Sequence, residues 1–136
     1  MSVPAGTEIF VRNRAVDRCQ YCQMHQSLQG ATFHIEHVIP FSMSGESEES
    51  NLALACPSCN LHKSNRVEVI DPESGESVRL FHPLTDSWNE HFGFDQFQIV
   101  GLTSIGRATE KALGFNHPRR VKIREAEARF ELFPPV

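Results

Sequence analysis

Two pairs of cysteines constrain the fold of this chain more than any other sequence feature. The first pair is Cys19 and Cys22, the second is Cys56 and Cys59, and 33 residues separate them. Four thiolates brought together in this way make a closed tetrahedral cage for zinc, with no open position for a substrate. We therefore expect a structural zinc ion, and the long gap indicates that further structure is built between the pairs.

Two other uses of the cysteines stay open, namely disulfide bonds and a redox-active pair. Disulfides are typical of secreted proteins, but residues 1–14 contain no basic stretch followed by an apolar run, which a secretory signal needs. No apolar stretch is long enough to cross a membrane. We therefore favour zinc and expect a cytoplasmic protein without membrane contact.

The charge of the chain is unevenly distributed. The formal net charge is −4, which argues against a generally basic nucleic-acid-binding protein. Residues 67–100 hold seven acidic side chains and one arginine, whereas residues 101–124 hold six basic side chains and one glutamate. Such a separation suits a polyanion bound to one face, and it also occurs on many solvated surfaces.

The first half of the chain is expected to form short elements around the cysteines. Thr7 is the expected N-cap of the first helix. The expected elements are a helix over 7–17, a strand over 32–38, a polar loop over 42–50, a short apolar element from Asn51 and a helix from Pro57 to about Asn65.

The second half is predicted to mix strands and helices. Thr103 is the expected N-cap of one helix and Gly114 its expected C′ residue, just beyond the helix end, and Asn116 is the expected cap of the last helix. The expected elements are a hairpin over 67–83, an irregular aromatic segment over 82–94, a strand over 97–102 and helices over 103–114 and 116–133.

The strand at 32–38 contains three hydrophilic side chains, His34, Glu36 and His37, in an otherwise apolar stretch. Burying them is costly unless they bind something. On a strand, His34 and Glu36 share one face while His37 points to the other, although a twist near the strand end could bring His37 round. A carboxylate can then hold a hard cation while the neighbouring histidine serves as a base.

The helix after the second cysteine pair places Cys59 and Asn60 about 100° apart. Cys59 can therefore face zinc while Asn60 faces the strand, so that zinc fixes Asn60 relative to Glu36. Lys63 and Arg66 follow about one and two turns later and are candidate phosphate contacts. Further candidates for DNA contact lie in the basic stretch of the last helix, which could equally be a solvated face; they are Arg119, Arg120 and Lys122.

The order of motifs over residues 19–63 resembles the zinc-stapled form of the HNH endonucleases, in the ββα-metal (His-Me finger) superfamily. The motifs are Cys-x2-Cys, His-Ile-Glu-His-Val-Ile-Pro and Asn-Leu-Ala-Leu-Ala-Cys-x2-Cys-Asn-x2-Lys. The resemblance implies an α+β fold, with a small ββα-metal core stapled by a four-cysteine zinc site over residues 1–66. Residues 67–136 then form an αβ extension packed on that core, and parts of it look similar to extensions of bacterial HNH proteins.

The resemblance also implies roles for residues of the strand and the second helix. His37 is the expected general base that activates water, and Glu36, in a place more often taken by Asp, ligates the catalytic cation together with Asn60. Asn51 braces the loop or the histidine backbone by hydrogen bonds. His34 lies where many relatives place a polar residue near the metal, and it is counted among the candidate ligands.

The implied activity is metal-dependent hydrolysis of DNA, leaving 5′-phosphate and 3′-hydroxyl ends. Oxygen ligands suit Mg²⁺ or Mn²⁺, and ligation by His34 would also admit Ni²⁺, Co²⁺ or Zn²⁺. DNA is the expected partner, with a homodimer or a second protein lending sequence specificity. Two alternatives stay open: a zinc-dependent nucleic-acid-binding module that does not cut, and a protein–protein adaptor that uses the acidic residues 67–100.

Overall fold

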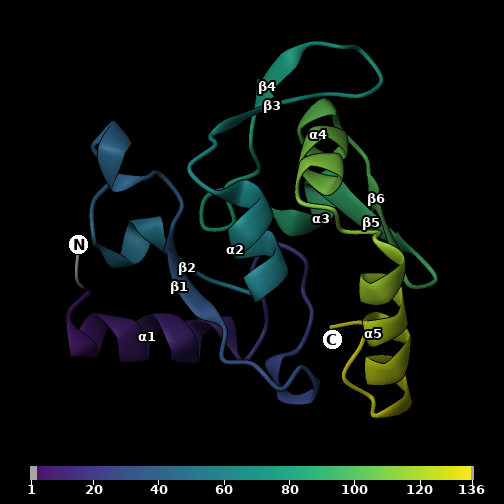
Figure 1. Cartoon of the computed structure of the whole chain (residues 1–136), viewed down its shortest axis with the longest axis horizontal. Helices are drawn as coiled ribbons and strands as arrows, with labels where there is room; N and C mark the ends of the chain where they lie inside the picture. Colours follow the sequence, from purple (N-terminus) through teal and green to yellow (C-terminus); the bar gives the residue numbers. More distant parts are fainter. Residues whose placement is uncertain (1–2, 136) are drawn as a thin grey trace.

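The structure is a computed structural model that describes residues 3–135. Over these residues the chain forms helices and three separate two-stranded antiparallel sheets, so the predicted α+β class is confirmed. Figure 1 shows the first half of the chain around α1 and β1–β2, and the second half around α4 and α5, with α2 between them.

The first half is built on one hairpin-like pair of strands covered by two helices. β1 and β2 are antiparallel, with His34 opposite Ala55 and His37 opposite Leu52. β2 is buried along its whole length, because α1 and α2 pack against it. The elements are α1 (Ala5–Ala15), β1 (His34–His37), β2 (Leu52–Ala55) and α2 (Pro57–Lys63), with 3₁₀ turns η1 (Gln26–Leu28), η2 (Phe41–Met43) and η3 (Glu49–Asn51).

The start of α1 differs from the prediction. The helix begins at Ala5, with Pro4 as N-cap and no side-chain cap, so Thr7 lies within its first turn. Pro4 has a backbone φ of −58°, and a proline fixed near this angle leads into a helix without a capping side chain. The prediction of Thr7 as N-cap was therefore wrong.

The second half contains the predicted hairpin, strand and two helices. Thr103 accepts a hydrogen bond from the amide of Gly106, and Gly114 has a φ of +62°, so both predicted ends of α4 are confirmed. The elements are β3 (Glu68–Ile70), β4 (Ser77–Arg79), α3 (Trp88–His91), β5 (Phe92–Asp95), β6 (Gln98–Gly101), α4 (Ser104–Ala112) and α5 (Pro118–Arg129).

Two details of the second half were predicted wrongly. The aromatic segment is not irregular throughout, because it contains α3 and also β5, which pairs with β6. The cap of α5 is His117, whose ring accepts a hydrogen bond from the amide of Arg119. Asn116 instead bonds both backbone groups of Ile99, as a neighbouring strand would do.

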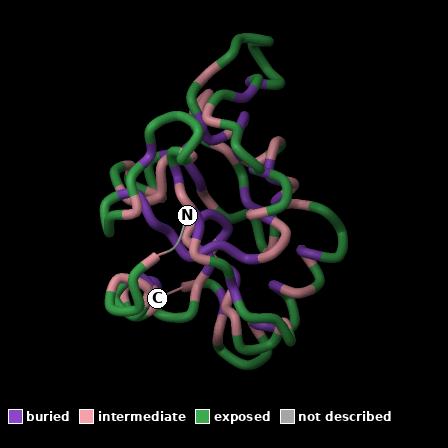
Figure 2. Tube along the Cα trace, turned by 60° about the vertical axis from the view of Figure 1, so that its left-hand side comes forward, coloured by how far each residue is buried: buried purple, intermediate pink, exposed green. Residues whose placement is uncertain are grey.

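The two halves share one hydrophobic core. Phe81, Phe92 and Phe115 meet at its centre, where the ring centroids of Phe81 and Phe115 lie 5.1 Å and 5.5 Å from that of Phe92. The indole nitrogen of Trp88 donates to the carbonyl oxygen of Tyr21, which lies between the first two cysteines. In Figure 2 the buried stretches run through the middle of the trace, while the hairpin at the top is largely exposed. The extension is therefore packed directly on the cysteine-bearing half.

The close approach of α4 to the end of α3 generates a prediction about Gly106. A Cβ added to this residue would overlap the carbonyl oxygen of His91, and backbone cannot move away as a flexible side chain can. We expect Gly106→Ala to lower the free energy of unfolding by roughly 2–3 kcal/mol, measured by urea denaturation.

Gly6 provides the matched control, because it also lies in a helix but a Cβ there meets nothing within 4 Å. Gly6→Ala should leave stability unchanged or raise it slightly. Equal stability of the two alanine variants would show that the contact between α4 and the end of α3 is looser than described.

Candidate active site and metal centre

The four cysteines form a buried cluster. Their sulfur atoms all lie within 4.8 Å of one another, and the sulfurs of Cys22 and Cys56 are 3.8 Å apart. Zinc–sulfur bonds of about 2.3 Å in a tetrahedron place the sulfurs roughly 3.8 Å apart, so the cluster fits zinc. All four are free cysteines, and the 3.8 Å between the sulfurs of Cys22 and Cys56 is far longer than a disulfide bond of about 2.05 Å. The predicted clustering of the two pairs is confirmed.

Each cysteine pair also directs a backbone amide at a sulfur. The amide of Cys22 donates to the sulfur of Cys19 at 3.5 Å, and that of Cys59 donates to the sulfur of Cys56 at 3.4 Å. Such bonds stabilise the thiolate form, which is the form that binds metal. The sequence folds the first pair as a tight turn, whereas the second pair opens α2, with Pro57 at its first position.

The candidate active-site cleft is an open hollow of ≈ 280 Å³ beside β1 and α2. Three of the predicted site residues line it together, namely Glu36, His37 and Asn60. His34 is exposed and does not line this cleft. The structure thus brings the expected base and two expected cation ligands to one place, and leaves the third candidate ligand outside it.

Glu36 is held from two sides by buried partners. The hydroxyl of Tyr21 donates to Oε2 at 2.7 Å, and the ammonium of Lys63 lies 2.6 Å from Oε1. Burial raises the pKa of Glu36 above its ordinary value, although Lys63 and Tyr21 act in the opposite direction. Oε1 is buried against the ammonium of Lys63, so a cation bound at this oxygen would take the place of that ammonium. The donors in the cleft therefore fit a hard divalent ion.

Lys63, a predicted phosphate contact, does not lie on the surface, where a phosphate could reach it. Its side chain is 1% exposed, because it reaches back from α2 to Glu36 and to the carbonyl oxygen of His37. A lysine ammonium paired with a buried carboxylate compensates its charge when no metal is bound. The lysine thus lies in the protein interior, behind the residues that line the cleft.

His37 lies at the end of β1 and is partly buried. Its Nε2 atom is 2.9 Å from the hydroxyl of Ser47. Burial, with a contribution from the charge of Lys63, lowers the pKa of His37 below its ordinary value. The imidazole is therefore neutral at neutral pH, which is the form required of a general base.

Asn51 holds the loop that joins His37 to Ser47. Its side chain accepts from the amide of Ile39 and donates to the carbonyl oxygens of Ile39 and Glu46. The loop is closed tightly, since a Cβ on Gly45 would overlap the carbonyl oxygen of Ile39. Only glycine fits there, and the closure brings Ser47 to the ring of His37.

The basic residues proposed for DNA contact separate into two groups. Arg66, Arg119 and Lys122 are exposed, and Arg66 also donates to backbone carbonyl oxygens of His62 and Ala112. Arg120 is instead 4% exposed, and its guanidinium contacts the sulfurs of the cysteine cluster. The structure therefore places Arg120 beside the cysteine cluster.

Tyr21 and Ser47 contact the expected catalytic residues, yet the sequence did not single them out. Tyr21 lies inside the first Cys-x2-Cys pair, and a tyrosine between two buried ligands is a usable signal for a buried hydroxyl that needs a partner. Ser47 belongs to a polar loop with several other serines, so nothing in the sequence distinguishes it.

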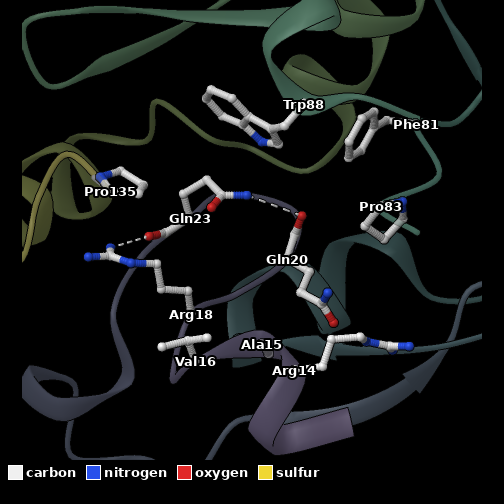
Figure 3. A pocket seen from close by; sticks show the side chains of 10 residues that line it. All are labelled: Arg14, Ala15, Val16, Arg18, Gln20, Gln23, Phe81, Pro83, Trp88 and Pro135. Carbon is white, nitrogen blue, oxygen red and sulfur yellow. Dashed lines mark hydrogen bonds between the residues drawn. The ribbon is translucent and has the colours of Figure 1, made fainter. Parts of the chain in front are cut away.

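A larger cavity of ≈ 490 Å³ lies between the end of α1, the first cysteine pair and the extension. Figure 3 shows Trp88 and Phe81 on one side of it and Arg14 and Arg18 on the other. Both arginines already donate to backbone carbonyl oxygens. The cavity contains none of the expected bases or ligands, which lie in the smaller cleft instead.

Comparison with known protein families identifies the same segment of the chain. Residues 19–66 match the family model described as HNH endonuclease, so the resemblance is confirmed over the cysteine-bearing core. Searches of curated proteins and of solved structures give no significant match. Among the described residues, no helix combines the length and apolar character that crossing a membrane requires.

Occupancy of the cysteine cluster can be tested directly. We expect the purified protein to carry zinc, measured by elemental analysis, and to show sulfur-to-cobalt charge-transfer bands after exchange with Co²⁺. Cys59→Ser should lose these bands and unfold in milder denaturant, whereas Ser58→Ala, a change at the adjacent position, should retain both. A mass two or four daltons below that of the reduced chain would instead indicate disulfides.

Proposed function

We propose that this protein is a metal-dependent endonuclease that hydrolyses phosphodiester bonds of DNA. The observation that carries the proposal is that Glu36, His37 and Asn60 line one cleft, within the segment that matches the HNH endonuclease family. Binding alone does not need a neutral histidine beside a carboxylate. A reaction that removes a proton from water next to a cation needs both.

In the proposed reaction, His37 acts as the general base. With its proton on Nε2, the ring donates to Ser47, which leaves Nδ1 free to accept a proton from water. The water oxygen then forms a bond to phosphorus while the bond from phosphorus to the 3′ oxygen breaks. The leaving oxygen takes up a proton from solvent, so the products carry 5′-phosphate and 3′-hydroxyl ends.

Glu36 and Asn60 are the proposed ligands of the divalent cation. A bound Mg²⁺ or Mn²⁺ supplies positive charge to the phosphoryl oxygens as negative charge builds on them. Tyr21 fixes one oxygen of Glu36 and thereby orients the carboxylate toward the cleft. Zinc in the cysteine cluster would have a separate, structural role. Cys59 directly precedes Asn60 on α2, so a zinc ion that holds Cys59 also fixes the position of Asn60.

Exposed basic residues supply the proposed contacts to the DNA backbone. Arg66, Arg119 and Lys122 are accessible on α5 and after α2, and each can neutralise one phosphate. Few such contacts are available on a chain with a net charge of −4. We therefore propose weak intrinsic sequence preference, with specificity lent by a second copy or a partner protein.

The ion pair of Glu36 with Lys63 favours a second candidate function. A lysine that already neutralises the carboxylate could leave the cleft without a divalent cation. The chain would then be a zinc-dependent nucleic-acid-binding module that does not cut. Activity in the presence of divalent cations distinguishes the two.

Nicking of supercoiled plasmid is the decisive experiment. With Mg²⁺ or Mn²⁺ we expect the wild type to produce open-circular DNA, and His37→Ala to reduce the rate by at least about 10²-fold, as loss of a general base does. His34→Ala is the matched control, and it should retain most activity because His34 lies outside the cleft. An intact plasmid across divalent metals, together with a gel shift, would establish the non-cutting module instead.

Lys63 gives a test that does not depend on cutting. Removing it leaves the buried carboxylate of Glu36 uncompensated, so Lys63→Met should lower the free energy of unfolding by about 3 kcal/mol or more. Added Mg²⁺ should restore part of this loss, because the cation replaces the ammonium. Urea denaturation of zinc-loaded protein, with and without Mg²⁺ and without chelator, measures both effects.

The double variant Glu36→Gln with Lys63→Met is the control. It has neither the buried charge nor the anionic ligand, so it should be more stable than Lys63→Met and insensitive to Mg²⁺. A Lys63→Met protein that gains no stability from Mg²⁺ would argue against Glu36 as a cation ligand.

A further inference from the structure

Helix α5 inserts one guanidinium into the side of the cysteine cluster. The Nη2 atom of Arg120 is 3.0 Å from the sulfur of Cys59 and 3.7 Å from that of Cys56. These cysteines belong to the second pair, 61 and 64 residues earlier in the chain. Arg120 is therefore a long-range partner of the candidate metal ligands.

The other contacts of Arg120 fix the guanidinium in place. Its Nη1 atom donates to the carbonyl oxygens of Leu113 and Gly114, at the end of α4, at 2.5 Å and 3.0 Å. The ring of Phe115 lies beside the guanidinium, with 5.6 Å from its centroid to Cζ. Two carbonyl groups and one aromatic ring thus aim Nη2 at the sulfurs.

A buried guanidinium needs a negative charge close by. Arg120 is 4% exposed, and no carboxylate within residues 3–135 forms a salt bridge with it. The sulfurs of Cys56 and Cys59 are the groups in contact that can carry that charge. A zinc ion with four thiolates has a net charge of −2, which is equally costly to bury without a cation. Each group therefore compensates the other.

We propose that Arg120 is a positioning residue of the zinc centre, which holds the thiolates of Cys59 and Cys56 by charge and hydrogen bonding. Partners of this kind in the outer shell of a metal orient the ligands and strengthen metal binding. The C-terminal extension then helps to retain the metal of a core that lies more than fifty residues before it. The proposal rests on zinc occupying the cluster and is independent of nuclease activity.

The experiment measures zinc affinity in competition with a chromogenic chelator. Arg120→Gln removes the charge, and we expect it to bind zinc about 10–100-fold more weakly than the wild type. Arg120→Lys keeps the charge but loses the planar fork, so its affinity should be intermediate. Arg119→Gln changes the preceding, exposed residue of α5 and should match the wild type.

A spectroscopic measurement separates this role from simple packing. Loss of the hydrogen bond to Cys59 changes electron donation from that sulfur, so the sulfur-to-cobalt charge-transfer bands of the Co²⁺-loaded protein should shift in both Arg120 variants and not in Arg119→Gln. Wild-type zinc affinity with an unshifted spectrum in Arg120→Gln would overturn the proposal. If Arg120→Gln does not fold, the same two measurements on Arg120→Lys decide it, and wild-type values in both would overturn it.

Discussion

The meeting of four cysteine sulfurs is the constraint on which the rest of the structure depends. It closes the chain between two segments that are far apart in sequence, and it fixes the start of α2 against the strands β1 and β2. Each strand has only four residues, and a two-stranded sheet of this size is marginal alone. The cluster and the shared core supply the stability that the sheet lacks.

Burial of charge follows the same rule at both sites. At the cluster, the guanidinium of Arg120 lies against sulfur atoms, and behind the cleft the ammonium of Lys63 lies against Glu36. In each case a basic side chain can be almost completely buried because it contacts a group that carries negative charge. Both residues are therefore buried against the candidate sites and do not extend the surface available to DNA.

The sequence predicted the parts of the fold that depend on short-range patterns. The cysteine spacing, the strand with His37, the hairpin and the caps of α4 are local features, and the structure contains them. β5 was missed because four residues with a central glycine give little periodic signal. Lys63 and Arg120 were assigned to the surface because charged residues usually lie there, and only tertiary contacts identify their buried partners.

Helix α2 explains why the metal centre and the cleft are adjacent. Cys59 faces the cluster, Asn60 lines the cleft, and Lys63, one turn later, reaches Glu36. A helix of seven residues cannot hold its own position in water, so its orientation depends on the cluster at its first turn. Because Arg120 contacts that same turn, the extension, the cysteine cluster and the cleft are linked through a single short element.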